Sequence, residues 1–365
     1  MSETVLKKEE RVAIALRSLY KKYGYLPYKM SKFEAYDLYA QNKDFLVGEG
    51  VITFTDTDGK LLALKPDVTL SIIKNAGDNG EKQKVYYNEN VYRISGDSKQ
   101  FKELMQVGLE CIGDLSVYDI YETLTLACAS LAEISPKFVL DISHLGILSG
   151  VLEEIALGEV FDNKAQKFVA EKNAHELLSL CETYKVSKEQ TEKLLVLITA
   201  YGTVESVLKT LAPLCKTGKT AKAYEELSSL CALLKTSEYA ENIRLDFSVV
   251  NALNYYNGIV FKGFIDGIYK SVLSGGRYDR LMARMQKETG AIGFAVYLDL
   301  LEGFEETRGA YDFDTLIVYD ENTDIRALVQ TVETLIANGE TVRTEKTQGK
   351  WRYKKLVNLQ SGDKV

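Results

Sequence analysis

The residues best suited to chemistry lie on a segment whose side chains alternate in polarity. Every second position from Met105 to Cys111 is apolar, and Gln106, Gly108 and Glu110 fall between them. Because successive side chains of a β-strand point to opposite faces, the segment predicts one core face and one face offering an amide and a carboxylate. The gap over Gly108 would leave room for a small ligand. An ordinary exposed polar face is the alternative, and it is the preferred interpretation of this strand alone.

Asp67 and Thr69 place a carboxylate and a hydroxyl at an expected strand-to-helix junction. Either side chain could cap the helix, which is the preferred interpretation of this segment alone. The alternative is recognition of a ligand ammonium. Arg93, on the strand before Gln106, could hold an anionic group through two guanidinium nitrogens. It could equally pair with Glu89, its neighbour on the same face, and the pattern leaves both open.

Two adjacent tyrosines, Tyr255 and Tyr256, lie beside amide side chains. They could form the walls of a site for a planar ligand and donate hydrogen bonds to it. The alternative is a tight turn with core tyrosines, because Asn257-Gly258 favours a turn. Two further glycines, in residues 275–279, could let the backbone approach a ligand closely, although paired glycines are common in turns.

The composition is that of a globular protein, with 46% hydrophobic and 27% charged residues. No apolar run is long enough to span a bilayer, and the first residues lack the apolar stretch of a secretory signal. We therefore expect a cytoplasmic location and no membrane partner. The net charge of −7 argues against a generally basic RNA-binding surface, and hence against tRNA as a partner. The best basic cluster, residues 350–355, is better explained as a solvated helix face.

The five cysteines and two histidines are too scattered for a metal site. No two cysteines form a Cys-x-x-Cys pair and their count is odd, so we expect buried free thiols. The histidines, His144 and His175, stand alone. The sequence contains neither a phosphate-binding P-loop nor a Rossmann fingerprint, and we expect no metal and no cofactor.

Periodicity and turn residues predict an α+β core on an antiparallel sheet. Asp58-Gly59 marks one hairpin and Asp266-Gly267 another. The expected strands cover residues 51–55, 60–64, 85–94, 104–112, 138–142, 243–250, 259–265 and 268–273. The expected helices of this core cover residues 6–23, 69–76, 117–134, 275–285 and 296–304.

Two segments depart from this core. Residues 147–240 are leucine- and lysine-rich with few strand signals, which predicts a helical insertion. The tail predicts a small C-terminal α/β module, marginal for independent folding. Its expected elements are strand 315–319, helix 325–337, strand 340–344 and helix 351–359. The expected domains are a core in two parts, 1–146 and 241–305, the insertion 147–240 and the module 306–365.

In this order, the polar segments resemble the catalytic core of histidyl-tRNA synthetases, a class II aminoacyl-tRNA synthetase family. Lys65-Pro-Asp-Val-Thr69 is similar to the family's Arg-Pro-Glu-Gly-Thr, and residues 93–113 resemble its motif 2, ending in Gln-x-Gly-x-Glu. Residues 251–257 resemble its Arg-Gly-Leu-Asp-Tyr-Tyr-Asn segment, and residues 275–279 and 293–295 its motif 3. The resemblance covers about residues 5–305 and implies the class II synthetase-like fold. It also implies a ligand site formed by Asp67, Thr69, Arg93, Gln106, Glu110, Tyr255 and Tyr256.

The departures from the family's pattern change the expected function. The arginine of the histidine-specific segment is Asn251 here, and the arginine of motif 3 falls at Leu300. The short motif 2 loop carries Lys99, Gln100 and Lys102 where arginines are expected. Adenylation moves negative charge that fixed cations stabilise, and losing one such contact costs on the order of 10²–10³ in rate. Efficient activation of an amino acid is therefore not expected.

A histidine-like pocket without adenylation chemistry is similar to the regulatory-subunit family of ATP phosphoribosyltransferase. That resemblance implies a non-catalytic allosteric subunit in the first step of histidine biosynthesis, with histidine as feedback ligand. It implies a dimer that joins the short-form catalytic subunit in a hetero-oligomer, commonly an octamer. The C-terminal module also looks too short for an anticodon-binding domain. The alternative is an atypical histidyl-tRNA synthetase or a related enzyme that activates an amino acid with ATP.

Overall fold

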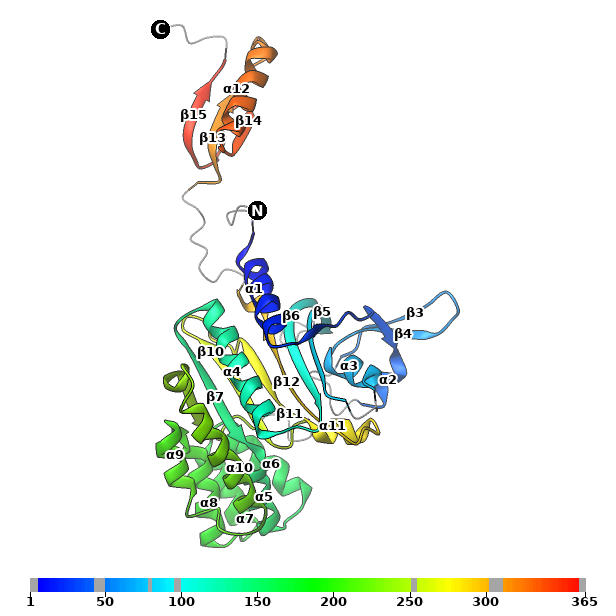
Figure 1. The fold of residues 1–365 in the computed structure, drawn as a ribbon, viewed down its shortest axis with the longest axis vertical. Coiled ribbons are helices and arrows are strands. Elements are labelled where there is room, and N and C mark those ends of the chain that lie inside the picture. Colours follow the sequence, from blue (N-terminus) through cyan, green and yellow to red (C-terminus); the bar gives the residue numbers. More distant parts are fainter. Residues whose placement is uncertain are drawn as a thin grey trace. The chain divides into compact units, whose positions relative to one another are not determined.

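The computed structural model describes residues 6–42, 50–77, 81–94, 100–250, 255–301 and 311–360. The chain forms two compact units, Met1–Glu302 and Gly303–Val365, and each contains a sheet of its own (Figure 1). Within the described ranges, no helix has both the length and the apolar character needed to cross a bilayer.

The first unit is built on a large sheet that is antiparallel except near its ends. Within the described residues its strand order is β1-β5-β6-β12-β11-β10-β7-β9-β8. The pairs β1–β5 and β7–β9 are parallel. The strands are β1 (Leu26–Pro27), β5 (Gln83–Ile94), β6 (Phe101–Gly113), β7 (Phe138–His144), β8 (Tyr201–Gly202), β9 (Ile243–Asp246), β10 (Ile259–Ile265), β11 (Leu273–Arg277) and β12 (Gly290–Tyr297). The predicted α+β class is confirmed.

Two helices cover one face of this sheet, α1 (Lys8–Lys22) and α4 (Val117–Ile134) (Figure 1). The apolar side of β6 faces them, since Val107 and Leu109 are fully buried. Gly263 of β10 shows how close α4 lies, because a Cβ there would come within 2.6 Å of Leu131. Side chains at even-numbered neighbours, such as Lys262, therefore point to the opposite face.

A smaller sheet and a short helix lie beside the β5 side of the main sheet (Figure 1). This sheet has the order β2-β4-β3, and its β3–β4 pair is the hairpin predicted at Asp58-Gly59. The helix, α3, begins at Thr69, as predicted. The bounds are β2 (Phe33–Ala35), α2 (Tyr36–Ala40), β3 (Thr53–Thr55), β4 (Leu61–Leu64), α3 (Thr69–Asn75) and α11 (Asp279–Arg284).

The leucine- and lysine-rich segment is helical, as the sequence predicts. It packs beside the β7 side of the sheet and contributes β8, which pairs with β9 (green in Figure 1). The segment belongs to the first compact unit, and its treatment as a separate inserted domain stays a prediction. Its helices are α5 (Leu145–Ile155), α6 (Glu159–Ala170), α7 (Ala174–Thr183), α8 (Lys188–Thr199), α9 (Val204–Leu211) and α10 (Gly218–Leu234).

Two predicted elements near the end of the first unit are wrong. Strand β11 begins at Leu273 instead of occupying 268–273, so its paired glycines lie inside a strand. A Cβ at Gly275 would come within 2.3 Å of the Gly293 carbonyl oxygen, so close packing between strands, not a turn, explains this glycine. The helix predicted over 296–304 is also wrong. Residues up to Tyr297 form strand β12, and a 3₁₀ turn, η3 (Leu298–Leu301), follows it. Residues 302–304 lie outside the described residues.

The second unit is a three-stranded parallel sheet with one helix, within residues 311–360. Its order is β14-β13-β15, and Ile317, Leu328 and Leu335 form its core. The helix predicted over 351–359 is wrong, because this segment pairs with β13 as a parallel strand. The basic cluster at 350–355 is therefore a loop and an edge strand, not a helix face. The bounds are β13 (Phe313–Val318), α12 (Ile325–Ala337), β14 (Val342–Glu345) and β15 (Tyr353–Asn358).

Candidate ligand site

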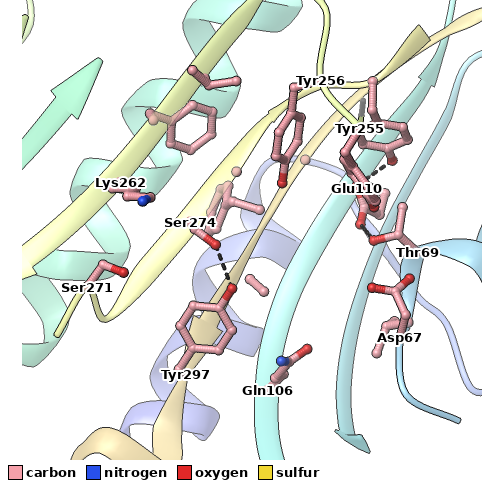
Figure 2. Close-up of a pocket in the computed structure, with 18 of the residues that line it drawn as sticks. Asp67, Thr69, Gln106, Glu110, Tyr255, Tyr256, Lys262, Ser271, Ser274 and Tyr297 are labelled. Carbon is pink, nitrogen blue, oxygen red and sulfur yellow. Dashed lines mark hydrogen bonds between the residues drawn. The ribbon is translucent and has the colours of Figure 1, made fainter. Parts of the chain in front are cut away.

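A cavity of about 380 Å³ opens on the sheet face that α1 and α4 leave uncovered. Its volume lies in the range of small-molecule sites, roughly 300–1,000 Å³. Figure 2 shows its polar side chains converging from several strands and from the start of α3. All seven residues expected from the sequence line it: Asp67, Thr69, Arg93, Gln106, Glu110, Tyr255 and Tyr256.

Glu110 is the buried carboxyl group of this cavity, with 2% of its surface exposed. The Thr69 hydroxyl donates to one carboxyl oxygen at 2.8 Å, and the Tyr278 hydroxyl donates to the other. Burial raises the pKa of Glu110 to about 8, because removing the charge from water outweighs these two hydrogen bonds. Glu110 is therefore mostly protonated at neutral pH, and a ligand cation beside it would favour the ionised form.

Asp67 both caps α3 and lines the cavity. One carboxylate oxygen accepts the Leu70 backbone N–H at 2.9 Å, so the predicted capping role is confirmed. Burial raises the pKa of Asp67, and the nearby Arg93 guanidinium opposes this shift. Helix capping and recognition of a ligand ammonium, the two interpretations left open by the sequence, are therefore compatible. A carboxylate that caps a helix can also face a cavity.

Two partners were expected for Arg93, an anionic ligand group or Glu89, and the structure excludes Glu89. Glu89 pairs with Lys65, whose ammonium lies 2.6 Å from the carboxylate and whose side chain is fully buried. Arg93 instead donates from Nε to the Pro66 carbonyl oxygen at 2.8 Å, and its side chain lines the cavity. Its guanidinium thus remains on the cavity wall beside Asp67.

The paired tyrosines form an aromatic wall, as predicted. The rings of Tyr255 and Tyr256 meet edge to face, with centroids 4.6 Å apart, and Tyr278 lies 5.8 Å from Tyr255. The expected open gap over Gly108 is wrong. A Cβ at Gly108 would come within 2.4 Å of the Tyr87 hydroxyl, so Tyr87 fills this space.

Several polar residues that were not expected from the sequence complete the cavity: Tyr87, Lys262, Ser271, Ser274, Tyr278 and Tyr297. The pairing register between neighbouring strands places these residues close together. Gly108 pairs with Tyr87 on one side and Ala295 on the other. Ala295 pairs with Ser274, which pairs with Lys262. This register could not be read from one strand at a time.

Two positions that carried the departure from adenylation chemistry, Asn251 and Lys99, lie outside the described residues. Leu300 lies in the 3₁₀ turn after β12. The described part of the chain contains no cluster of three or more His, Cys, Asp or Glu that could hold a metal ion. All five cysteines are buried free thiols, as predicted.

Gly293 provides a direct test of how Glu110 is held. A Cβ at Gly293 would come within 1.7 Å of Glu110 Oε2, so we expect Gly293→Ala to displace the carboxyl group. Ligand affinity should fall at least about tenfold, and overpacking should destabilise the fold by about 1–3 kcal/mol. Calorimetry measures the change in affinity, and urea unfolding measures the change in stability.

Gly263→Ala is the control, because it crowds Leu131 on the opposite face of the sheet. It should destabilise the fold and leave the affinity unchanged. Equal losses of affinity in both variants would contradict this role.

Comparison with known proteins places these observations in a family context. Residues 1–301 match the family model for histidyl-tRNA synthetase. The chain is 27% identical over 332 residues to an ATP phosphoribosyltransferase regulatory subunit from Ruminiclostridium cellulolyticum, covering 88% of this chain and 79% of the relative. The structure of an ATP phosphoribosyltransferase regulatory subunit/histidyl-tRNA synthetase from Bacillus halodurans aligns with a TM-score of 0.79 and 22% identity, over 97% of this chain and 94% of that one.

A second solved structure is an ATP phosphoribosyl transferase (HisG:HisZ) complex from Thermotoga maritima. One of its chains aligns with a TM-score of 0.63 and 20% identity, covering 78% of this chain and 96% of that chain. The Bacillus halodurans alignment and the family model confirm the predicted synthetase-like fold.

Proposed function

This chain belongs to the histidyl-tRNA synthetase family, and on that premise we propose that it is the non-catalytic regulatory subunit of ATP phosphoribosyltransferase, acting in the cytoplasm. It serves the first step of histidine biosynthesis. One observation carries the proposal. The chain keeps a buried, polar amino-acid cavity, while its relatives bear the name of the regulatory subunit.

The cavity supports histidine as the regulatory ligand. Its acidic end suits an ammonium or an imidazole N–H, since Asp67 and Glu110 lie there with Thr69 between them. The aromatic wall of Tyr255 and Tyr256 suits a flat imidazole ring. An analogue that lacks one of histidine's hydrogen-bonding groups would leave a buried group of the cavity without a partner. Such an analogue should bind less tightly than histidine.

The chain has no catalytic activity of its own in this proposal. Leu300 is apolar and Asn251 is neutral, so neither position supplies the guanidinium that stabilises a transferring phosphoryl group. Arg93 and Lys262 remain as cavity cations. Arg93 is already held by the Pro66 carbonyl oxygen.

The proposed assembly is a hetero-oligomer with the short-form catalytic subunit. The Thermotoga maritima complex supports such a pairing, since one of its chains shares this fold. A dimer of this chain within an octamer is the expected arrangement. Feedback requires that histidine bind two states of the assembly with different affinity, because a ligand that binds both equally shifts neither.

Mixing the purified chain with the short-form catalytic subunit tests this function. We expect the two to co-purify, the transferase activity to rise on mixing, and histidine to lower it. The chain alone should show no histidine-dependent exchange between ATP and pyrophosphate. Unchanged transferase activity on mixing, together with exchange at a normal synthetase rate, would instead favour an amino-acid-activating enzyme.

A further inference from the structure

A chain of polar side chains connects the helical segment α5–α10 with the wall of the ligand cavity. Glu226 lies on α10, and Arg277 is the last residue of β11 in the main sheet. Glu226 Oε1 lies 3.6 Å from Arg277 Nη1. Helix α10 packs against α5 and β7 (Figure 1). The two side chains therefore join the helical segment to the sheet, and neither of them lines the cavity itself.

A buried histidine holds the Glu226 carboxylate from its other side. His144 Nδ1 accepts the Gly146 backbone N–H at 3.0 Å, so the neutral ring carries its proton on Nε2. That nitrogen lies 3.4 Å from Glu226 Oε2, and His144 is only 4% exposed. The His144 imidazole lowers the pKa of Glu226 and the Arg277 guanidinium adds to this effect, although burial opposes it. Glu226 is therefore an ionised group at neutral pH with a defined orientation.

Arg277 continues the chain of contacts to Asn257. Arg277 Nε donates to Asp279 Oδ2 at 2.7 Å, and the Asn257 side-chain amide donates to the same oxygen at 3.2 Å. Asn257 Oδ1 accepts the Asp279 backbone N–H at 2.7 Å. The Asn257 backbone N–H donates to the Arg277 carbonyl oxygen at 3.0 Å. Three hydrogen bonds thus fix Asn257 to the pair formed by Arg277 and Asp279.

Asn257 directly follows the aromatic wall of the cavity. Tyr255 and Tyr256 precede it in the chain, and both line the cavity. Tyr256 also packs on β11, since a Cβ at Gly276 would come within 2.8 Å of its ring. Because peptide planes are rigid, fixing the backbone of Asn257 limits where the preceding residues can lie. A displacement of Arg277 would therefore move the wall.

Attachment of the helical segment to the sheet is the simpler explanation of the Glu226–Arg277 pair. Such a pair would contribute little, because 33% of the Glu226 side chain and 27% of the Arg277 side chain are exposed. Attachment alone, however, does not require either partner to be oriented by further groups. Here His144 orients Glu226, and Asp279 orients Arg277. These additional contacts favour a role in positioning the cavity wall.

We propose that Glu226 is a positioning residue for the aromatic wall, and that it acts through Arg277 and Asn257. The inference rests on the proposed function, because it concerns the ligand affinity of the same cavity. It gives the helical segment a part in regulation. A contact that displaces α10 changes the affinity for histidine, and histidine binding acts back on α10 with the same coupling free energy.

Calorimetry with histidine on the full chain tests the coupling. Glu226→Gln keeps the shape of the side chain and removes its charge, and we expect affinity to fall about 3–10-fold, as for residues that modulate a site without contacting its ligand. Arg277→Gln should lower affinity at least as much. The double variant should bind no more weakly than Arg277→Gln alone, because Glu226 acts through Arg277. Fully additive losses would overturn this order of action.

Hydrogen exchange tests the same coupling without any ligand. The Asn257 backbone N–H is bonded to the Arg277 carbonyl oxygen, so a loosened Arg277 should open this bond more often. We expect peptides covering residues 255–258 to exchange about 3–10-fold faster in Glu226→Gln than in the wild-type chain. Unchanged exchange would overturn the inference. A wild-type chain that binds no histidine would instead contradict the proposed regulatory ligand, and exchange would still decide the role of Glu226.

Glu154→Gln is the matched control for a purely structural effect. Glu154 pairs with Lys193 at 2.9 Å within the helical segment, and 34% of its side chain is exposed, much as for Glu226. Urea unfolding should show similar small shifts of the midpoint in both variants. Glu154→Gln should leave histidine affinity and exchange at residues 255–258 unchanged. Equal losses of affinity in the two variants would assign Glu226 a structural role only.

Discussion

Replacing Glu110 by glutamine is expected to weaken histidine binding at pH 8 by about 100-fold or more. The substitution keeps the shape of the side chain and removes the carboxylate charge that the Thr69 and Tyr278 hydroxyls orient. A charge-assisted hydrogen bond contributes about 1.5–3 kcal/mol, and each 1.4 kcal/mol corresponds to a factor of ten. Burial at 2% exposure places the effect near the upper end of that range.

The pH dependence of binding gives this prediction a distinctive signature. The pKa of Glu110 is about 8 in the free chain, so the carboxyl is protonated below that pH. A bound ligand cation would lower this pKa, and binding would then release a proton. Affinity should therefore rise with pH up to about 8 and level off above it. Glu110→Gln should bind weakly without this rise.

The same pKa has a consequence for stability without ligand. In the unfolded chain Glu110 ionises near the ordinary glutamate pKa of 4.5, and in the folded chain its pKa is about 8. The folded state therefore holds an extra proton between these values, and stability falls as pH rises across this window. Glu110→Gln should flatten that slope.

Calorimetry in buffers with different ionisation enthalpies measures both the affinity and the proton release. Glu103→Gln is the matched control, since Glu103 lies exposed on the same strand and does not line the cavity. It should leave binding unchanged. Wild-type affinity in Glu110→Gln would show that Glu110 serves only the fold.

Glu89→Gln is expected to cause the largest loss of stability, about 3 kcal/mol. Glu89 pairs with Lys65, whose side chain is fully buried while that of Glu89 is 16% exposed. Removing one partner leaves the Lys65 ammonium without a counter-charge, and breaking buried pairs costs about 3–5 kcal/mol. We place the effect at the low end because water reaches Glu89.

Urea unfolding measures this loss, and a double variant separates its cause. Lys65→Met combined with Glu89→Gln removes the orphaned charge, so it should be more stable than Glu89→Gln alone. The control is Glu171→Gln, which breaks an exposed pair with Lys167. That change should cost less than about 0.5 kcal/mol. Similar losses in the two single variants would contradict a special role for the buried pair.

Local patterns predicted where several residues of this site lie, and the resemblance to a known family predicted that they form one ligand site. Alternation along β6 assigned Gln106 and Glu110 to one face, and the strand-to-helix junction placed Asp67 and Thr69 at the start of α3. Both patterns depend on backbone geometry within a few residues, so they survive in a single sequence. Apolar runs were less informative. The run through β12 suits a buried strand or a helix equally, which is why the helix over 296–304 was predicted wrongly.

By itself, the sequence determined which chemical groups this chain can offer: two carboxyl groups, an amide, an arginine and paired tyrosines. Only the tertiary structure decided how they meet. Pairing between strands far apart in the chain sets Lys262 across the sheet from Gly108, gives Glu89 to Lys65 and fills the gap over Gly108 with Tyr87. Such contacts depend on register and on burial from water, and neither is a property of any one segment.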